Sequence, residues 1–104
     1  MRLDARDPRE ARSVRLAVEK LEATGPGLRF PHQSAVRGTG AGLRELRPRA
    51  GRSRWRVVYI QLGGWFVLLA LAPEAMLDPR GFRGAIDRAL ARLDDHPTEE
   101  QDGP

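Results

Sequence analysis

The sequence predicts an α+β fold, in which an N-terminal helix or helices pack on a small antiparallel sheet and a C-terminal helix follows. Segments with helical spacing of apolar residues lie near both ends of the chain, and two β-rich segments separated by two glycines lie in the middle. A length of 104 residues allows one domain with a single modest core. We therefore expect a single domain over residues 1–96 and an acidic, disordered tail over residues 97–104.

The first helix is expected over residues 8–23. Pro8 suits the first turn of a helix, because its missing N–H has no partner there in any case. Apolar residues then recur at helical spacing, namely Val14, Ala17, Val18 and Leu21. The Gly25-Pro26 pair ends the run, since neither residue continues a helix well.

The middle of the chain is expected to form the sheet. We predict a loop over residues 27–42, with one short helical turn near residues 33–37. A short strand is expected over residues 43–47, and Pro48 ends it because proline cannot donate to a strand ladder. A basic turn follows over residues 49–53.

Two longer strands are expected over residues 55–62 and 65–72, joined by Gly63-Gly64 as a tight hairpin. Alternation across this hairpin gives one aliphatic face, which we expect to pack against helices. Its residues are Val58, Ile60, Val67, Leu69 and Leu71. The other face is more aromatic and polar and is predicted to be open to a partner. Its residues are Trp55, Val57, Tyr59, Gln61, Phe66, Leu68 and Ala70.

A final helix is expected from Asp78-Pro79 to His96-Pro97, where the second proline stops it. One apolar stripe runs along it at helical spacing, formed by Phe82, Ala85, Ile86, Ala89, Leu90 and Leu93.

Charge is unevenly distributed along the chain. The formal net charge is +4, and the 18 basic residues are 17 arginines and Lys20. Eight arginines lie between residues 29 and 56 with one acid, Glu45, whereas residues 94–104 carry five acids and neither lysine nor arginine. Because a guanidinium holds phosphate oxygens in pairs, the central block predicts a polyanionic partner. A solvated face or a subunit contact is the alternative.

The sequence disfavours several kinds of site. Without cysteine there is no disulfide, thiolate zinc site or cysteine nucleophile, and the two histidines, His32 and His96, lie far apart, so neither metal nor cofactor is expected. The glycine-rich residues 38–42 lack the Gly-Lys-Ser/Thr of a phosphate loop. The longest uncharged run, residues 57–73, is too short for a membrane span, and the charged N-terminus lacks the apolar core of a signal peptide. We expect a soluble cytoplasmic protein.

The arginines around the predicted sheet are candidates for binding RNA phosphates. They can also stabilise the extra negative charge that forms when a ribose 2′-hydroxyl attacks the next phosphate. Since arginine does not release its proton, Tyr59, His32 or Glu45 is expected to transfer protons. Structural roles are the alternatives: Tyr59 as a sheet residue and His32 as an incidental loop residue. Glu45 is most simply explained as the ion-pair partner of a neighbouring arginine such as Arg47 or Arg56.

Three segments resemble the sheet of RelE/HigB-type toxins from bacterial type II toxin–antitoxin pairs, within the RelE/ParE superfamily. They are Gly42-Leu43-Arg44-Glu45-Leu46-Arg47, Arg54-Trp55-Arg56-Val57-Val58-Tyr59 and Phe66-Val67-Leu68-Leu69. Residues 21–38 are similar to the segment that joins the helices of these toxins to the sheet, and residues 82–93 to their C-terminal helix. The resemblance covers about residues 8–95.

The resemblance implies a toxin that enters the ribosomal A site and cleaves mRNA without a metal. It also implies a cognate antitoxin partner, often a helix-turn-helix protein. It places catalysis at Arg47, Arg56 and Tyr59. Contacts with RNA are expected at Arg44, Arg49, Arg52, Arg54 and His32.

The chain departs from that family's pattern at both ends of the sheet. Members usually begin with a strand before the first helix, and many carry a lysine pair and a late tyrosine after the last long strand, whereas residues 70–76 contain neither. Two alternative functions therefore stay open. One is a RelE/ParE-like protein that acts by binding an antitoxin or DNA gyrase without cutting RNA, and the other is an unrelated arginine-rich nucleic-acid-binding protein.

Overall fold

The computed structural model describes residues 8–95, so the tail predicted over residues 97–104 lies outside the described residues. The elements, in chain order, are α1 (Pro8–Thr24), η1 (Gly25–Gly27), β1 (Gln33–Ala35), β2 (Arg44–Leu46), η2 (Pro48–Gly51), β3 (Trp55–Leu62), β4 (Trp65–Pro73) and α2 (Pro79–Asp94). This order confirms the α+β prediction, with both helices and the hairpin where the sequence places them.

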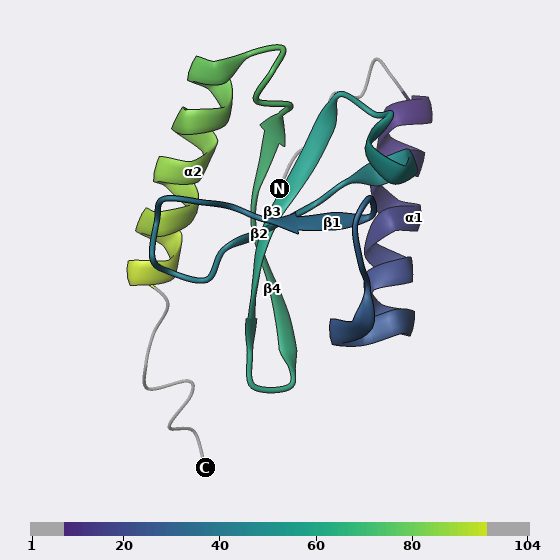
Figure 1. The fold of residues 1–104 in the computed structure, drawn as a ribbon, viewed down its shortest axis with the longest axis horizontal. Helices are drawn as coiled ribbons and strands as arrows, with labels where there is room; N and C mark the ends of the chain where they lie inside the picture. Colours follow the sequence, from purple (N-terminus) through teal and green to yellow (C-terminus); the bar gives the residue numbers. More distant parts are fainter. Residues whose placement is uncertain (1–7, 96–104) are drawn as a thin grey trace.

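The four strands form one antiparallel sheet in the order β1-β2-β3-β4. Glu45 of β2 lies between Ser34 of β1 and Val58 of β3, so the short strands continue the sheet from the long hairpin. Figure 1 shows the sheet between two helices, with α1 on one side and α2 on the other. The molecule therefore has three layers, and both faces of the sheet are covered.

Each helix covers its face of the sheet through its own apolar cluster. The buried residues of the α2 cluster are Leu43, Val58, Ile60, Leu69, Ala70, Ala72, Ala85, Ile86 and Ala89. Those of the α1 cluster are Val14, Leu21, Leu28, Leu46, Val57 and Tyr59. The prediction of an open aromatic face is therefore wrong, because the apolar stripe of α1 is buried against the face that carries Tyr59.

A β-bulge in the hairpin changes which residues share a face. Tyr59 pairs with Leu68, but Val58 pairs with Ala70, so Leu69 is an extra residue in β4. Beyond the bulge the faces exchange: Leu71 packs with the α1 cluster and Ala70 with the α2 cluster. The predicted faces are right near the turn and wrong for Leu71 and Ala70, because simple alternation assumes an unbroken ladder.

The strand β1 replaces the helical turn that we expect near residues 33–37. Its main chain pairs with β2, and the buried Gln33 side chain donates from Nε2 to the carbonyl oxygen of Leu28 at 2.8 Å. At α2 the expected start is confirmed, since the Asp78 carboxylate accepts a hydrogen bond from the Gly81 amide at 2.9 Å.

Candidate nucleic-acid interface

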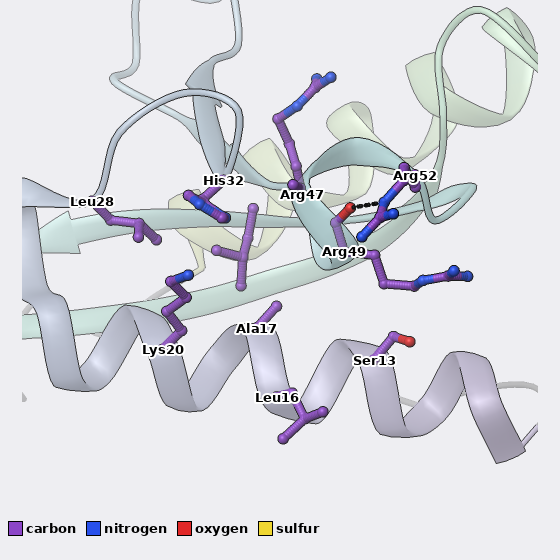
Figure 2. Close-up of a pocket in the computed structure, with 11 residues that line it drawn as sticks. Ser13, Leu16, Ala17, Lys20, Leu28, His32, Arg47, Arg49 and Arg52 are labelled. Carbon is purple, nitrogen blue, oxygen red and sulfur yellow. Dashed lines mark hydrogen bonds between the residues drawn. The ribbon is translucent and has the colours of Figure 1, made fainter.

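A pocket of about 280 Å³ lies between α1 and the segment that contains β2 and η2. It is lined by Ser13, Leu16, Ala17, Lys20, Leu28, His32, Leu46, Arg47, Arg49, Ala50 and Arg52. Figure 2 shows Lys20 extending from α1 toward His32 on the opposite wall, while the Arg47 side chain points away from the helix. One helix and one turn, distant in the sequence, thus form the two walls.

The lining of this pocket is basic. Among residues 8–95, five of its lining side chains are lysine, arginine or histidine and none is acidic. Four of the five, namely His32, Arg47, Arg49 and Arg52, are sequence-predicted site residues. Because the lining combines basic and apolar residues, the pocket is suited to a ligand that combines negative charge with an apolar part.

The turn η2 places two of these arginines at the pocket through an unusual backbone. Arg49 and Ala50 have φ angles of 56° and 55°, and Gly51 has a φ of +92°. Left-handed conformations reverse the chain within a few residues, so Arg49 and Arg52 leave the turn close together. The Arg52 Nε donates to the Arg49 carbonyl oxygen at 3.2 Å (Figure 2).

The Arg47 side chain is tied to the segment before β1 and to β2. Its Nε donates to the Pro31 carbonyl oxygen at 3.1 Å, and its Nη1 lies 3.1 Å from Glu45 Oε1 in an ion pair. Its guanidinium carbon also lies 5.2 Å from the centre of the Phe30 ring. These contacts fix the side chain while leaving it 21% exposed.

Arg56, by contrast, is buried beneath the turn, with a side chain only 2% exposed. Its Nη1 donates to the carbonyl oxygens of Ser53 and Trp55 at 2.7 and 2.9 Å, and its Nη2 donates to Gly51 at 3.4 Å. Nη2 lies 3.3 Å from Glu74 and Nε lies 3.5 Å from Glu45, without a hydrogen bond at Nε. The guanidinium therefore acts as a scaffold for the basic turn.

Two carboxylates partly offset the effect of burial on the Arg56 guanidinium. Burial, and then the nearby Arg47 charge, lower the pKa of Arg56, whereas Glu74 and Glu45 oppose that shift. A buried charge of this kind is tolerated only when it is paired and hydrogen-bonded. Its main-chain contacts thus couple the position of the pocket arginines to the hairpin strand β3.

Tyr59 is 2% exposed and packs edge-on against Phe66, with ring centres 6.1 Å apart. Burial raises the pKa of Tyr59, and the Arg44 guanidinium opposes this shift. Tyr59 and Arg44 line a second cavity of about 190 Å³ together with Gln33. The Gln33 Oε1 accepts a hydrogen bond from Arg44 Nε at 2.7 Å. Tyr59 therefore does not line the basic pocket.

The structure divides the predicted site residues among four places. His32, Arg47, Arg49 and Arg52 line the basic pocket, while Arg44 and Tyr59 line the second cavity. Arg54 lies over the Trp55 ring, 5.7 Å from its centre, at a third pocket beside Leu77. Arg56 is buried. The three residues predicted for catalysis are thus not gathered around one open site.

Sequence reasoning missed the contribution of α1. Ser13, Leu16, Ala17 and Lys20 all line the pocket, and they follow the i, i+3, i+4, i+7 spacing of one helical stripe. The stripe ends in the single lysine of the chain, but nothing in residues 13–20 indicates which element they face. A hydrogen bond also joins α1 to the segment after η2. Ser53 Oγ donates to the Glu10 carboxylate, whose two oxygens lie 3.0 and 3.2 Å away.

Within residues 8–95 no cluster of three or more histidine, cysteine or acidic side chains is arranged to hold a metal ion. Over the same described part of the chain, neither helix has the length and apolar character needed to cross a bilayer.

Comparison with known families identifies a match over the first part of the chain. A model of the family described as Phage derived protein Gp49-like (DUF891) matches residues 1–71, which is more than half of the 104 residues. Every residue that lines the basic pocket falls inside this matched region. No curated protein and no solved structure gives a significant match.

Proposed function

Because the chain belongs to the Gp49-like family of phage-derived proteins, a family of the toxin–antitoxin type, we propose that it is the toxin of such a pair and that its basic pocket binds messenger RNA. The observation that carries this proposal is the lining of the pocket between α1 and η2, where the described residues contribute five lysine, arginine or histidine side chains and no acidic one. Arginine and lysine side chains at such density are typical of phosphate contacts.

The proposed activity is ribosome-dependent cleavage of mRNA that inhibits translation. In this reaction a ribose 2′-oxygen attacks the adjacent phosphorus and the bond to the next 5′-oxygen breaks. The products are a cyclic phosphate and a 5′-hydroxyl. His32 is proposed to accept the 2′-hydroxyl proton and to pass it to the departing 5′-oxygen, while Arg47 stabilises the developing phosphorane charge.

Arg56 and Tyr59 receive supporting roles in this proposal. Arg56 holds the carbonyl oxygens of the turn that carries the RNA-binding arginines. Tyr59 packs in the apolar cluster that joins β3 to α1 and Leu28. Arg49 and Arg52, together with Lys20, are proposed to bind the phosphates that flank the cleaved bond.

A cognate antitoxin is the proposed partner, and a helix-turn-helix protein is the expected kind. Because the pocket is cationic, we expect the neutralising segment of the antitoxin to be acidic and to cover Arg49 and Arg52. Such a segment would compete directly with RNA for the same guanidinium groups.

Inducible expression in a bacterial host tests the proposal, with the 5′ ends of cellular mRNA mapped within minutes of induction. We expect new in-frame cuts with the natural chain and a strong loss of cuts with the double variant Arg49→Ala/Arg52→Ala. The matched control is Arg80→Ala/Arg83→Ala, which removes the same charge from the exposed surface of α2 on the other side of the sheet. Equal loss in both variants contradicts a specific role for the pocket.

Binding without cleavage is the second candidate function. It is favoured by the burial of Arg56 and Tyr59, which leaves His32 as the proton-transfer group at the pocket. Growth arrest with intact mRNA would support this alternative, with DNA gyrase as the target to examine next.

A further inference from the structure

An exposed aromatic ring lies beside residues that line the basic pocket: Phe30 stands between Leu28 and His32 in the chain and contacts Arg47. Phe30 is 69% exposed, although its neighbours Leu28 and Gln33 are buried. A single exposed apolar ring is common on protein surfaces; what makes Phe30 a candidate for ligand contact is its contact with Arg47, which lines the pocket.

The ring is held from one side. The Arg47 guanidinium lies over it at 5.2 Å from its centre, in the geometry of a cation–π contact. Arg47 is itself fixed by the Pro31 carbonyl oxygen and Glu45, so the ring stands against an ordered support. The large exposed fraction of Phe30 leaves much of its surface available to a ligand.

We propose that Phe30 is a stacking platform for one unpaired nucleobase, and that the pocket therefore selects single-stranded RNA over duplex RNA. This inference rests on the proposed function and names the form of RNA that the site accepts. A nucleotide supplies both chemistries present here, namely a phosphate for Arg49 and Arg52 and a flat base for Phe30.

The combination argues against ligands that carry only one of these features. A bare polyphosphate would use the arginines and leave the ring in water. In a duplex the bases are stacked on one another, so a base cannot reach the ring without being unpaired. Only a single strand offers a base and its neighbouring phosphate together at no unpairing cost.

The test measures binding of the purified full chain to a short, labelled 2′-O-methyl RNA, which cannot be cleaved because it lacks the attacking hydroxyl. A matched 2′-O-methyl duplex and inorganic polyphosphate, used as a competitor, are the comparison ligands. The variants are Phe30→Ala, Phe30→Leu, Phe30→Trp and Arg49→Ala/Arg52→Ala. Phe30 is exposed, so its variants are expected to fold, and thermal unfolding checks this.

We expect Phe30→Ala and Phe30→Leu to weaken single-strand binding about ten-fold, the effect of losing one stacked base. Phe30→Trp should retain the affinity, since it keeps a flat aromatic face. Competition by polyphosphate should be unchanged in all three variants but weakened in Arg49→Ala/Arg52→Ala. A 2-aminopurine base in the single strand should change its emission on binding the natural chain but not Phe30→Ala.

The outcomes distinguish a failure of the stacking platform from a failure of the proposed RNA-binding function. Loss of RNA affinity in Arg49→Ala/Arg52→Ala but not in Phe30→Ala overturns the stacking platform and leaves the basic pocket as an RNA site. That result would also be obtained if the ring served a protein partner. If neither variant changes the RNA affinity, both the stacking platform and the RNA-binding role of the pocket are overturned. Equal affinity for single strand and duplex overturns the stated selectivity.

Discussion

Buried at the start of β3, the Arg56 guanidinium is held by main-chain carbonyl oxygens of the turn before it and by two carboxylates. The Arg-x-x-Tyr pattern of the sequence predicts a catalytic role for Arg56, but its burial favours a role in positioning the turn. Arg47, nine residues earlier, occupies the open position instead. At the residue scale, exposure and partners decide which arginine can meet a phosphate.

Replacing Arg56 should therefore destabilise the folded protein, because the residue has a structural role. We expect Arg56→Ala to lower the free energy of unfolding by about 3–5 kcal/mol, because it leaves two carboxylates and several carbonyl groups without their partner. Denaturant unfolding measures this, with the exposed Arg83→Ala as a control expected to change stability by less than about 0.5 kcal/mol. An Arg56→Ala protein as stable as the natural chain would contradict this structural role.

Tyr59 gives a prediction about alkaline pH. Burial raises the pKa of Tyr59, so the unfolded chain loses this proton first, near pH 10, while the folded chain still holds it. The stabilisation is complete below about pH 10 and is lost as the pH rises through the folded-state pKa. Tyr59→Phe should lose less stability than the natural chain between pH 9 and pH 11, values chosen to bracket the ordinary tyrosine pKa of about 10.

This titration can be followed directly, because Tyr59 is the single tyrosine of the chain. Tyrosinate absorbance of the folded protein should rise at a higher pH than that of the chain in denaturant. Arg44→Gln removes the nearby charge that opposes the shift, so it should move the transition to still higher pH. Coincident titration of the folded and denatured chains would contradict the burial of the hydroxyl.

At the scale of elements, the sequence predicted what depends on local signals and missed what depends on the sheet as a whole. Proline starts, helical stripes and the Gly63-Gly64 turn place α1, α2 and the hairpin correctly. The bulge at Leu69 and the strand β1 have no comparable local signal, since both exist through pairing with a neighbouring strand. The turn η2 was expected only as basic; its left-handed backbone at Arg49 and Ala50 was not.

Gly51 of η2 offers a direct test of how this turn holds the pocket. Its φ of +92° strains any other residue, and an added Cβ would lie 2.9 Å from Arg47 Nη2. We expect Gly51→Ala to lower the free energy of unfolding by about 1–2 kcal/mol and to weaken RNA binding by displacing the Arg47 guanidinium. Both effects are measurable on one purified variant.

The matched control for that variant lies in the hairpin turn. A Cβ at Gly64 would meet nothing within 4 Å, and its φ is not positive. Gly64→Ala should therefore leave RNA affinity unchanged. If Gly51→Ala lowers the stability but leaves RNA affinity unchanged, RNA binding does not depend on the present position of the Arg47 side chain.

For the whole molecule, the sequence predicted the basic character of the candidate site but not the elements that form its two walls. Unequal charge along the chain indicated a basic surface, and four predicted residues do meet in one pocket. The other wall is a helical stripe that ends in Lys20, and nothing local to residues 13–20 shows that the fold brings it against η2. Packing of α1 on the sheet is what joins the two walls.

Salt dependence of RNA binding tests whether that assembled pocket, and not the overall charge, binds the polyanion. Arg47 is paired with Glu45, so we expect Lys20, Arg49 and Arg52 to neutralise about three phosphates. For a single strand this predicts a slope of about −2 in a plot of log affinity against log salt concentration. Arg49→Ala/Arg52→Ala should reduce the slope to about −0.7, because two counterion-releasing contacts are lost.

The control Arg80→Ala/Arg83→Ala removes the same two charges from α2 and should leave the slope unchanged. The net charge of the molecule is the same in both variants, so only the location of the lost charge differs. A slope that falls equally in both would mean that the chain attracts nucleic acid through its total charge, as expected for a general arginine-rich binder. A loss confined to the pocket variant ties binding to the surface that α1 and η2 build together.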